Sequence, residues 1–301
     1  MARSSKTFTD RRFRIVGIVL LALVVLVLSP AFARFYTDYL WFNSLDLVTV
    51  FTRRLSASLG LTAIAATVAI AFLIANWSLF PHWLAPSDEI VRRISVTSRS
   101  QRSSEPQEIA ISARPLRRLF AFAALGVGFF LGLSFRNLWR TYLLAREATP
   151  FGLLEPIFGR DVGFYVLELP WYETLLSRVQ LLLIITLAGL ALRYALFEKL
   201  KSRPATAHLS LVGSTWLITV GLGRLLSRLT LLQSQEGVLF GAGYTDIHAR
   251  LPLYTVEAVL FFVAATALIV NLFTRQWKVL VAIGLFWVGL NLLGPLYPAV
   301  V

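Results

Sequence analysis

Long apolar runs, separated by shorter polar stretches, dominate the pattern of this 301-residue chain. A helix needs roughly 20 apolar residues to cross the hydrocarbon core of a bilayer. Seven runs approach or reach that length, and we expect each to form a membrane-spanning helix. They cover residues 15–33, 56–80, 119–135, 175–197, 209–226, 253–273 and 279–297. The pattern therefore predicts an all-α, polytopic membrane protein with about seven transmembrane helices.

Charged residues make two of the seven runs weaker candidates for membrane spans than the others. Arg178 and Arg193 lie near the two ends of run 175–197, and Arg224 lies near the end of run 209–226. A long arginine side chain can keep its stem in apolar surroundings while its charged group reaches the interface. Both runs therefore remain predicted spans.

The first run has two interpretations. It follows a basic start and ends in Ala-Phe-Ala at residues 31–33, which is typical of a secretory signal with its cleavage site. The apolar core of such a signal is usually about 7–15 residues long, which is shorter than this run. We favour an uncleaved anchor, and cleavage before residue 34 is the alternative.

The composition excludes several other classes of protein. Hydrophobic residues make up 57% of the chain and charged residues 15%, whereas a soluble domain has about 45–50% and about 25%. A soluble enzyme, a disordered tail and a coiled coil are therefore excluded.

The positive charge predicts how the chain is threaded. With the N-terminus inside, 17 Lys and Arg residues fall on the inner side and ten on the outer side. Because inner segments carry the excess of Lys and Arg, we expect a multi-pass protein of the bacterial plasma membrane with a cytoplasmic N-terminus and an extracytoplasmic C-terminus. The predicted organisation is a basic segment 1–14, a seven-helix domain 15–301 with an inner loop 81–118, and ordered outer loops 34–55, 136–174 and 227–252. The charge sits between apolar runs and no nucleic-acid motif accompanies it, so nucleic acid is not an expected partner.

The segments between the runs differ in kind. Residues 81–115 are basic and Ser-rich without an apolar period, so we expect them to be flexible. Residues 35–51 combine tyrosine and tryptophan with polar residues that interrupt the apolar pattern. We interpret them as an interfacial helix, with the aromatic side chains at the depth of the lipid head groups.

Three outer stretches carry a resemblance to a known family. Residues 38–55 read DYLWFNSLDLVTVFTRRL, residues 150–170 read PFGLLEPIFGRDVGFYVLELP, and residues 241–252 read GAGYTDIHARLP. With seven predicted spans, these stretches resemble the bacterial integral membrane proteins of uncharacterised protein family 0182. The resemblance runs from the first predicted helix to the last, and PIFGRDVGFY and GAGYTD are its most specific segments.

The resemblance implies a seven-helix membrane part followed by a large extracytoplasmic domain. It implies no catalytic residue, because no activity is assigned to the family. The present sequence departs from the family pattern because it stops just beyond the seventh run. We therefore expect either a fragment or split gene product, or a membrane part that stands alone.

A polar cluster is expected between the predicted spans. Arg224 lies near the outer end of the fifth span, and Glu257 lies about one turn inside the outer end of the sixth. Their depths are similar, and a charge in a bilayer is costly unless it is paired. We expect an ion pair between them, with Glu173 and Arg178 nearby. This cluster is either an outer-facing site for an ion or head group, or a bridge that fixes helix packing.

Other polar and small residues suggest packing and loop roles. Asn271 and Asn291 are expected to form hydrogen bonds between helices. Gly128 and Gly132 in one run, and several alanines in run 56–80, are each expected to allow close approach of a neighbouring helix. Two outer loops are expected to be ordered caps that dock an outer domain or protein partner, simple loop structure being the alternative. Their candidate residues are Gly159, Arg160, Asp161 and Gly163 in the first loop, and Gly241, Gly243, Tyr244 and Asp246 in the second.

The sequence shows no catalytic constellation. The chain has no cysteine, and its three histidines, His82, His208 and His248, are too far apart to form a metal-binding pair. We expect these histidines to be isolated interfacial or loop residues, and we expect no cofactor and no enzymatic activity. The lipid bilayer is the expected partner. The favoured function is an anchor or assembly module for an extracytoplasmic activity, and the alternative is a transporter or channel for an ion or envelope component.

Overall fold

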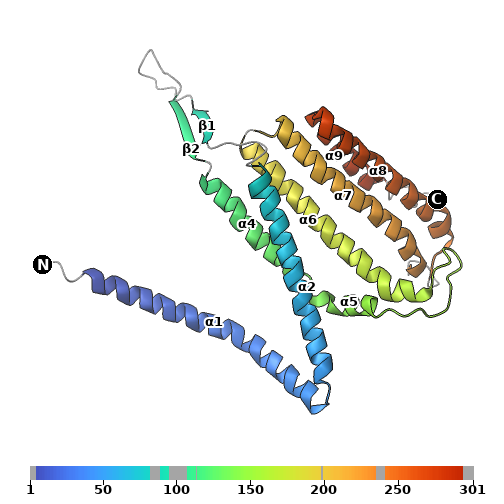
Figure 1. Cartoon of the computed structure of the whole chain (residues 1–301), viewed down its shortest axis with the longest axis horizontal. Helices are drawn as coiled ribbons and strands as arrows, with labels where there is room; N and C mark the ends of the chain where they lie inside the picture. Colours follow the sequence, from blue (N-terminus) through green and yellow to red (C-terminus); the bar gives the residue numbers. More distant parts are fainter. Residues whose placement is uncertain are drawn as a thin grey trace. The chain divides into compact units, whose positions relative to one another are not determined.

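The computed structural model describes residues 5–81, 89–94, 107–112, 114–197, 199–234 and 241–293, and these ranges are almost entirely helical (Figure 1). The chain divides into two compact units, Met1–Ala57 and Ser58–Val301. The described part thereby confirms the predicted all-α polytopic class. The last residues, 294–301, which are predicted to lie outside the cell, are beyond the described ranges.

The first unit contains helix α1 (Ser5–Ser44) and the start of α2 (Val48–Ile74). The predicted span 15–33 lies within α1, which continues past Pro30 to Ser44. The prediction of a separate interfacial helix over residues 35–51 is therefore wrong, because this stretch is the end of α1, a tight turn and the beginning of α2. Asp46 takes a positive φ of 56° in that turn.

Aromatic rings hold the turn between α1 and α2 together. Phe51 is buried, and its ring centroid lies 5.6 Å from that of Phe35, 5.9 Å from that of Tyr39 and 5.6 Å from that of Phe42. Clustered rings bury a large apolar area, which stabilises the turn without a polar partner. The three rings thus pack on Phe51 across the helix–turn–helix.

The second unit is built from the rest of α2, from the helices that follow it and from two short strands. The elements are η1 (Ala75–Leu79), β1 (Glu89–Ile94), β2 (Gln107–Ser112), α4 (Arg114–Leu133), η2 (Arg136–Leu138), α5 (Trp139–Arg146), η3 (Phe164–Glu168), α6 (Leu169–Leu196), α7 (Arg203–Thr230), η4 (Leu231–Gln233), η5 (Asp246–Arg250), α8 (Leu251–Thr274) and α9 (Trp277–Leu293). Each of the six later predicted runs lies largely within one of these helices.

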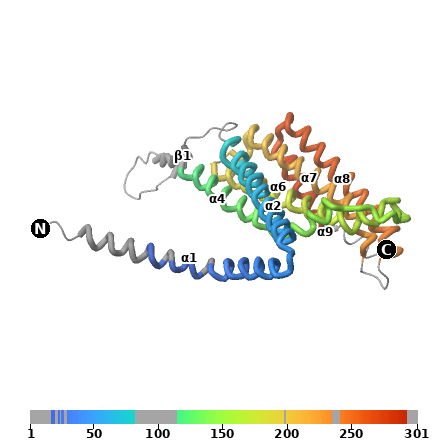
Figure 2. The backbone as a smooth tube through the Cα atoms, turned by 60° about the horizontal axis from the view of Figure 1, so that its bottom comes forward, coloured from blue at the N-terminus to red at the C-terminus, as the bar shows by residue number. Residues whose placement is uncertain are grey.

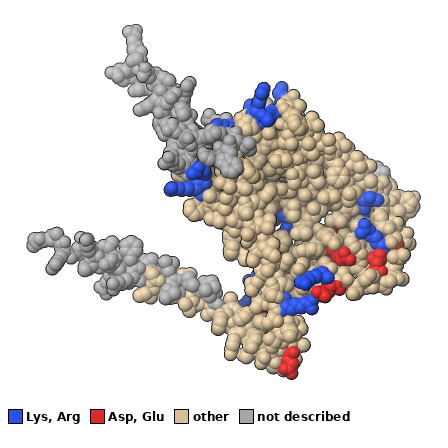
Figure 3. All heavy atoms as spheres, in the orientation of Figure 1, with Lys and Arg blue, Asp and Glu red and all other residues tan. Residues whose placement is uncertain are grey.

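Five helical stretches within the described ranges are long and apolar enough to cross a membrane. They are Val48–Leu79, Pro115–Arg146, Phe164–Leu196, Arg203–Gln233 and Asp246–Thr274. A shorter apolar helix, Trp277–Leu292, follows them. Figure 3 shows that the visible surface of the second unit is mostly uncharged and that its charged side chains gather toward the two ends.

Helices α6, α7 and α8 lie side by side as the centre of the second unit (Figures 1 and 2). A proline lies in the first turn of each of these helices. At the start of α7, after the extended residue Ser202, its missing N–H costs no hydrogen bond, whereas α6 and α8 follow directly on the π-helical turns η3 and η5. We call the end of the unit that holds residues 147–163 and 241–245 the loop end. The end that holds the α6–α7 and α8–α9 turns is the turn end.

Small residues bring α2 and α4 into close contact, whereas the sequence predicts only that each of these helices allows close approach to some neighbour. A Cβ atom on Gly132 would lie 2.4 Å from Cβ of Ala66, and one on Gly128 would lie 2.6 Å from Cγ1 of Ile70. Neither position can accept a larger residue unless the two helices separate. The glycine pair and the facing alanine therefore set the α2–α4 distance.

A tryptophan joins α6 to the short π-helical turn η1. Trp77 is buried, and its Nε1 donates a hydrogen bond of 3.1 Å to the backbone oxygen of Thr186. The indole lies directly on Gly189, where an added Cβ would come within 2.2 Å of the ring. The glycine therefore leaves the space that the indole occupies.

The basic loop between α2 and α4 contains regular structure that the sequence analysis did not predict. Strands β1 and β2 pair antiparallel, with Glu89 opposite Ser112 and Ile94 opposite Gln107. The prediction that the whole of 81–115 is flexible is therefore wrong for these two strands. The strands were not predicted because they are short and because their few apolar residues lie in a basic, Ser-rich segment.

Candidate functional site

The ion pair expected between two spans is present in the second unit. Nε of Arg224, on α7, lies 2.9 Å from Oε2 of Glu257, on α8. Glu257 is 3% exposed, and the Arg224 guanidinium also lies 5.9 Å from the centroid of the Tyr254 ring. The carboxylate oxygen is close to the guanidinium without being aligned for a hydrogen bond. The attraction is therefore mainly between the two charges.

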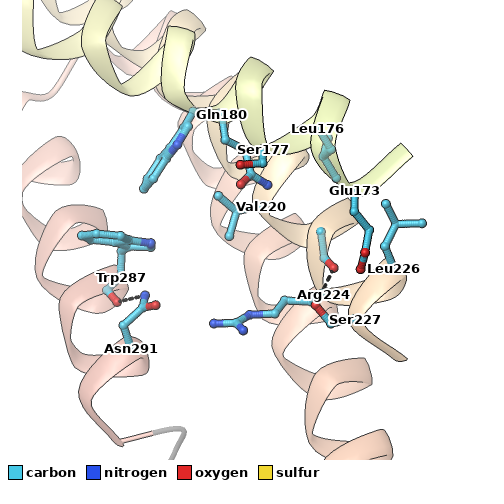
Figure 4. Close-up of a pocket in the computed structure, with 12 residues that line it drawn as sticks. Glu173, Leu176, Ser177, Gln180, Val220, Arg224, Leu226, Ser227, Trp287 and Asn291 are labelled. Atoms are coloured by element: carbon cyan, nitrogen blue, oxygen red, sulfur yellow. Dashed lines mark hydrogen bonds between the residues drawn. The ribbon is translucent and has the colours of Figure 1, made fainter. Parts of the chain in front are cut away.

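The guanidinium of Arg224 faces a cavity of about 400 Å³ between α6, α7 and α9 (Figure 4). The polar residues that line this cavity are Glu173, Ser177, Gln180, Arg224, Ser227 and Asn291. Several of them are satisfied locally, since Nε2 of Gln180 donates to the oxygen of Thr219 at 2.7 Å and Nδ2 of Asn291 donates to the oxygen of Trp287 at 2.8 Å. The groups left for a ligand are chiefly the outer guanidinium nitrogens of Arg224, because the carboxylate of Glu173 already accepts a hydrogen bond from the side chain of Thr230.

The structure separates Arg178 from this cavity. Ser177 faces the Arg224 cavity, whereas Arg178, the next residue, lines a different cavity of about 270 Å³ between α2, α4 and α6. Consecutive helical residues point about 100° apart, so the two side chains of this pair reach different neighbours. Arg224, Glu257 and Glu173 therefore form the polar cluster without Arg178.

The asparagines expected to join helices behave differently from each other. Nδ2 of Asn271, on α8, donates a hydrogen bond of 2.9 Å to Oγ of Ser210, on α7, as predicted. Asn291 bonds within its own helix instead, so the prediction for it is wrong. Asn271 also accepts from the backbone N–H of Gln276 at 2.9 Å and thereby helps to end α8.

Asp161 organises the first loop-end segment. Its carboxylate accepts hydrogen bonds from the backbone N–H groups of Phe151 at 2.9 Å, Gly152 at 2.8 Å and Gly163 at 2.7 Å. These bonds, that of Phe151 first, lower the pKa of Asp161 below its ordinary value. Asp161 thus binds the backbone of its own loop, and the structure gives it no pairing with Arg160.

The neighbouring residues complete this loop. Gly159 has a φ of +65°, a backbone conformation that glycine adopts without strain. The guanidinium of Arg160 lies 4.7 Å from the centroid of the Phe164 ring. Glu155 accepts hydrogen bonds from the N–H groups of Ile157 and Phe158 and from the hydroxyl of Tyr165. The PIFGRDVGFY segment is therefore an ordered loop with its own polar network.

The second loop-end segment is ordered in a similar way around Asp246. Its Oδ2 accepts from the N–H of Gly243 at 2.9 Å, and its Oδ1 lies 3.1 Å from Nη1 of Arg250. Gly241 has a φ of +119°, and the ring of Tyr244 stacks on that of His248 with 4.0 Å between centroids. Asp246 is buried, whereas Tyr244 is exposed.

The end of α7 and the turn η4 connect the two segments. Nε2 of Gln233 donates to the backbone oxygen of Tyr165 at 2.8 Å, and the guanidinium of Arg228 lies 5.7 Å from the Phe158 ring centroid. Gly241 donates its N–H to the oxygen of Ser234 at 2.9 Å. We call residues 147–165 together with 231–234 and 241–248, in their described part, the loop cap.

A buried polar chain near the turn end was missed by sequence reasoning. Nε2 of His208 lies 3.1 Å from Oδ1 of Asn76, and its Nδ1 lies 3.0 Å from the hydroxyl of Tyr194. The prediction that His208 is interfacial or in a loop is wrong, because it is buried within α7. His82 lies outside the described residues. One feature of the sequence could have indicated this chain of hydrogen bonds. Each of its three members, Asn76, Tyr194 and His208, is a polar residue that interrupts an apolar stretch.

Arg193 lies close to this chain as a second buried cation. It is 5% exposed, and its guanidinium lies 5.8 Å from the Phe120 ring centroid and 5.6 Å from that of Phe197. Nη1 has no hydrogen-bond partner. Among the described residues, no group of three or more His, Asp or Glu side chains gathers where it could hold a metal ion.

A family model and relatives from other organisms match most of this chain. The model of the Uncharacterised protein family (UPF0182) matches residues 15–301. A UPF0182 protein of Pelotomaculum thermopropionicum is 29% identical over 97% of this chain, and one of Salinispora arenicola is 31% identical over 94% of it. The chain spans 33% and 28% of the lengths of these two relatives, respectively. No solved structure matches the chain.

Proposed function

The chain belongs to the uncharacterised protein family UPF0182, and from this premise we propose that it is an integral membrane anchor or assembly module for an extracytoplasmic function. The curated relatives are much longer than the region they share with this chain. A membrane region that accompanies a larger part has to hold that part in place, and the loop cap is the surface best suited to do so.

The distribution of positive charge supports an orientation in which the loop cap lies outside the cell. The inner segments of a seven-span threading carry 17 Lys and Arg residues and the outer segments ten. This threading through α1, α2, α4 and α6–α9 puts the loop cap on the extracytoplasmic side of the plasma membrane. The partners would then be the bilayer and an extracytoplasmic domain or protein.

Exposed apolar side chains on an ordered loop carry the proposal. Leu153 is 65% exposed and Leu154 is 69% exposed, although both lie in the loop that Asp161 holds with three backbone hydrogen bonds. Phe151, Ile157 and Tyr244 are exposed on the same cap. Such a loop cannot fold its apolar side chains inward without losing these bonds, so a partner surface has to cover them.

Site-specific cross-linking tests this function. The chain has no cysteine, so a single cysteine at Leu154 can carry a photoreactive probe, with a matched cysteine at Leu222, which is exposed on α7. The proposal predicts a protein adduct at position 154, with an extracytoplasmic polypeptide identified by mass spectrometry, and lipid adducts alone at 222. Adducts with lipid alone at both positions, or with cytoplasmic proteins at 154, contradict it.

The cavity beside Arg224 favours a second candidate, a transporter or channel for an ion or envelope component. Its polar lining lies between three helices and includes the partly exposed guanidinium. Saturable uptake into liposomes that Glu257→Gln abolishes would support transport. Absence of uptake with the wild-type chain in the same vesicles leaves the anchor as the better account.

A further inference from the structure

Arg178 is a charged residue inside a predicted span that belongs to neither the loop cap nor the Arg224 cavity. It lies in α6, within the apolar stretch Phe164–Leu196. Its Nε is buried without a hydrogen-bond partner, and no carboxylate of the described residues forms an ion pair with it. A charge in a membrane span is costly unless something pairs with it or it reaches the interface. This guanidinium therefore lacks an anion.

The cavity that Arg178 lines is otherwise almost entirely apolar. Its volume is about 270 Å³, and the walls come from α2, α4 and α6, with Ser134 as the one polar lining residue besides the arginine. Trp171 stands at one end of it, seven residues before Arg178 on the same helix. Arg178 and Trp171 thus line the same cavity from two levels of α6, with Trp171 nearer the loop end.

This cavity continues into a longer furrow between α2 and α6. A second, mainly apolar cavity of about 870 Å³ shares Val68, Val179 and Leu182 with it. Helix α7 forms a further wall of this second cavity, which extends to Asn76, His208 and Arg275. Along α2 and η1 the cavity walls run from Leu61 to Phe80, and the part from Val68 to Phe80, beyond the level of Val179, is about 18 Å at 1.5 Å per residue. One leaflet of a bilayer has a hydrocarbon thickness of about 15 Å. The furrow is therefore long enough for an extended acyl chain.

We propose that this furrow binds one anionic phospholipid, with the lipid phosphate on Arg178 and an acyl chain along Val68, Val179 and Leu182. A guanidinium binds phosphate with two parallel hydrogen bonds, which supplies the missing anion. The mainly apolar walls accept the chain, and the almost entirely apolar surroundings of Arg178 disfavour a small hydrophilic anion. The site is separate from the loop cap and does not depend on what the cap binds.

Native mass spectrometry of the whole chain in detergent tests the site, with phosphatidylglycerol, phosphatidylcholine and glycerol phosphate added separately. Wild type is expected to retain one phosphatidylglycerol. Arg178→Gln should weaken this binding about tenfold, as expected for one charge-assisted contact. Arg140→Gln, which removes an exposed arginine of α5, should leave it unchanged. Glycerol phosphate should neither bind nor compete, because it lacks the acyl chain.

A second variant tests the furrow without touching the charge. Val68 is 57% exposed, so Val68→Trp can fill the furrow without disturbing the core, and Val263→Trp on α8, which is similarly exposed, is its control. The first should reduce retention of phosphatidylglycerol and the second should not. Equal retention by wild type, Arg178→Gln and Val68→Trp overturns the proposal. Equal binding of phosphatidylcholine and phosphatidylglycerol, or displacement by glycerol phosphate, overturns it as well.

Discussion

Nε of Arg224 on α7 lies 2.9 Å from Oε2 of Glu257 on α8, so a partly exposed guanidinium pairs with a carboxylate that is 3% exposed. A buried carboxylate that loses its partner is costly, whereas removing the carboxylate itself leaves a guanidinium that can turn into the cavity. The two residues are therefore expected to respond unequally to substitution.

Arg224→Gln should lower the free energy of unfolding by about 3–5 kcal/mol, because it leaves an unpaired buried charge. Glu257→Gln should lower it less, by about 1–3 kcal/mol. Both are measured by unfolding in detergent, followed through tryptophan fluorescence. The matched control is Arg146→Gln, whose partner Glu147 lies 3.9 Å away on the surface, and it should change stability by less than about 1 kcal/mol. If Glu257→Gln has the same free energy of unfolding as wild type, the ion pair does not stabilise the packing of α7 on α8.

Substitution of Gly132 should disturb the contact between α2 and α4. An added Cβ would meet Cβ of Ala66 at 2.4 Å, so Gly132→Ala should destabilise the protein by about 1–3 kcal/mol. Gly126, on the same helix, has no atom within 4 Å of an added Cβ. Gly126→Ala should therefore leave stability unchanged or raise it by up to about 1 kcal/mol. Equal effects of both substitutions in a thermal unfolding assay would show that the helices are not in contact there.

The buried chain Asn76–His208–Tyr194 should behave as a unit. Asn76→Ala or Tyr194→Phe leaves one ring nitrogen of His208 without its partner, which should cost about 1–3 kcal/mol. The double variant should deviate from the sum of the single effects by about 0.5–3 kcal/mol, because both residues bond the same imidazole. Simple additivity of the two substitutions would contradict a shared network.

Acid should loosen the first segment of the loop cap. Asp161 has a pKa lowered mainly by the N–H of Phe151, so its ionised form stabilises the loop. This contribution is complete above the unfolded value of about 4 and is lost as the pH falls through the lower folded value. Hydrogen exchange at the amides of Phe151, Gly152 and Gly163 should therefore accelerate as the pH falls from about 5 through the lowered pKa of Asp161. This acceleration should exceed the intrinsic change of the exchange rate with pH.

The control for this pH effect is Asp161→Asn. The neutral side chain cannot titrate, so exchange at the same amides should be faster than in wild type at pH 7 and should lack the additional acid-induced step. An acid-induced step of the same size in the variant would assign the effect to another group.

Sequence patterns predicted the helices and part of their packing. Apolar runs locate the helices because length and hydropathy are local properties, and Arg224 and Glu257 were matched because charges of opposite sign lay at equal depth in two spans. Close helix approach was predicted at the glycines of α4 and at the alanines of α2, but the contact between Gly132 and Ala66 is known only from the structure. These predictions needed only spacing along each helix.

Helix rotation and long-range pairing could not be predicted in the same way. Arg178 was grouped with Arg224, although one step along α6 turns it toward α2, and this rotation depends on the packing of all three helices. His208 required knowledge of which side of α7 meets Asn76. The helix α1 continues past Pro30, a residue that removes one of its hydrogen bonds and that composition alone would place at a helix end.

Cysteine labelling of intact cells tests the central claim, a polytopic membrane protein with its loop cap outside, most directly. Single cysteines at Leu154 in the loop cap and at Lys201 in the α6–α7 turn, in a chain without native cysteines, are exposed to a membrane-impermeant maleimide. The account predicts that position 154 reacts in intact cells and that position 201 reacts only after permeabilisation. Reaction of both positions in intact cells, or the reverse pattern, would contradict it.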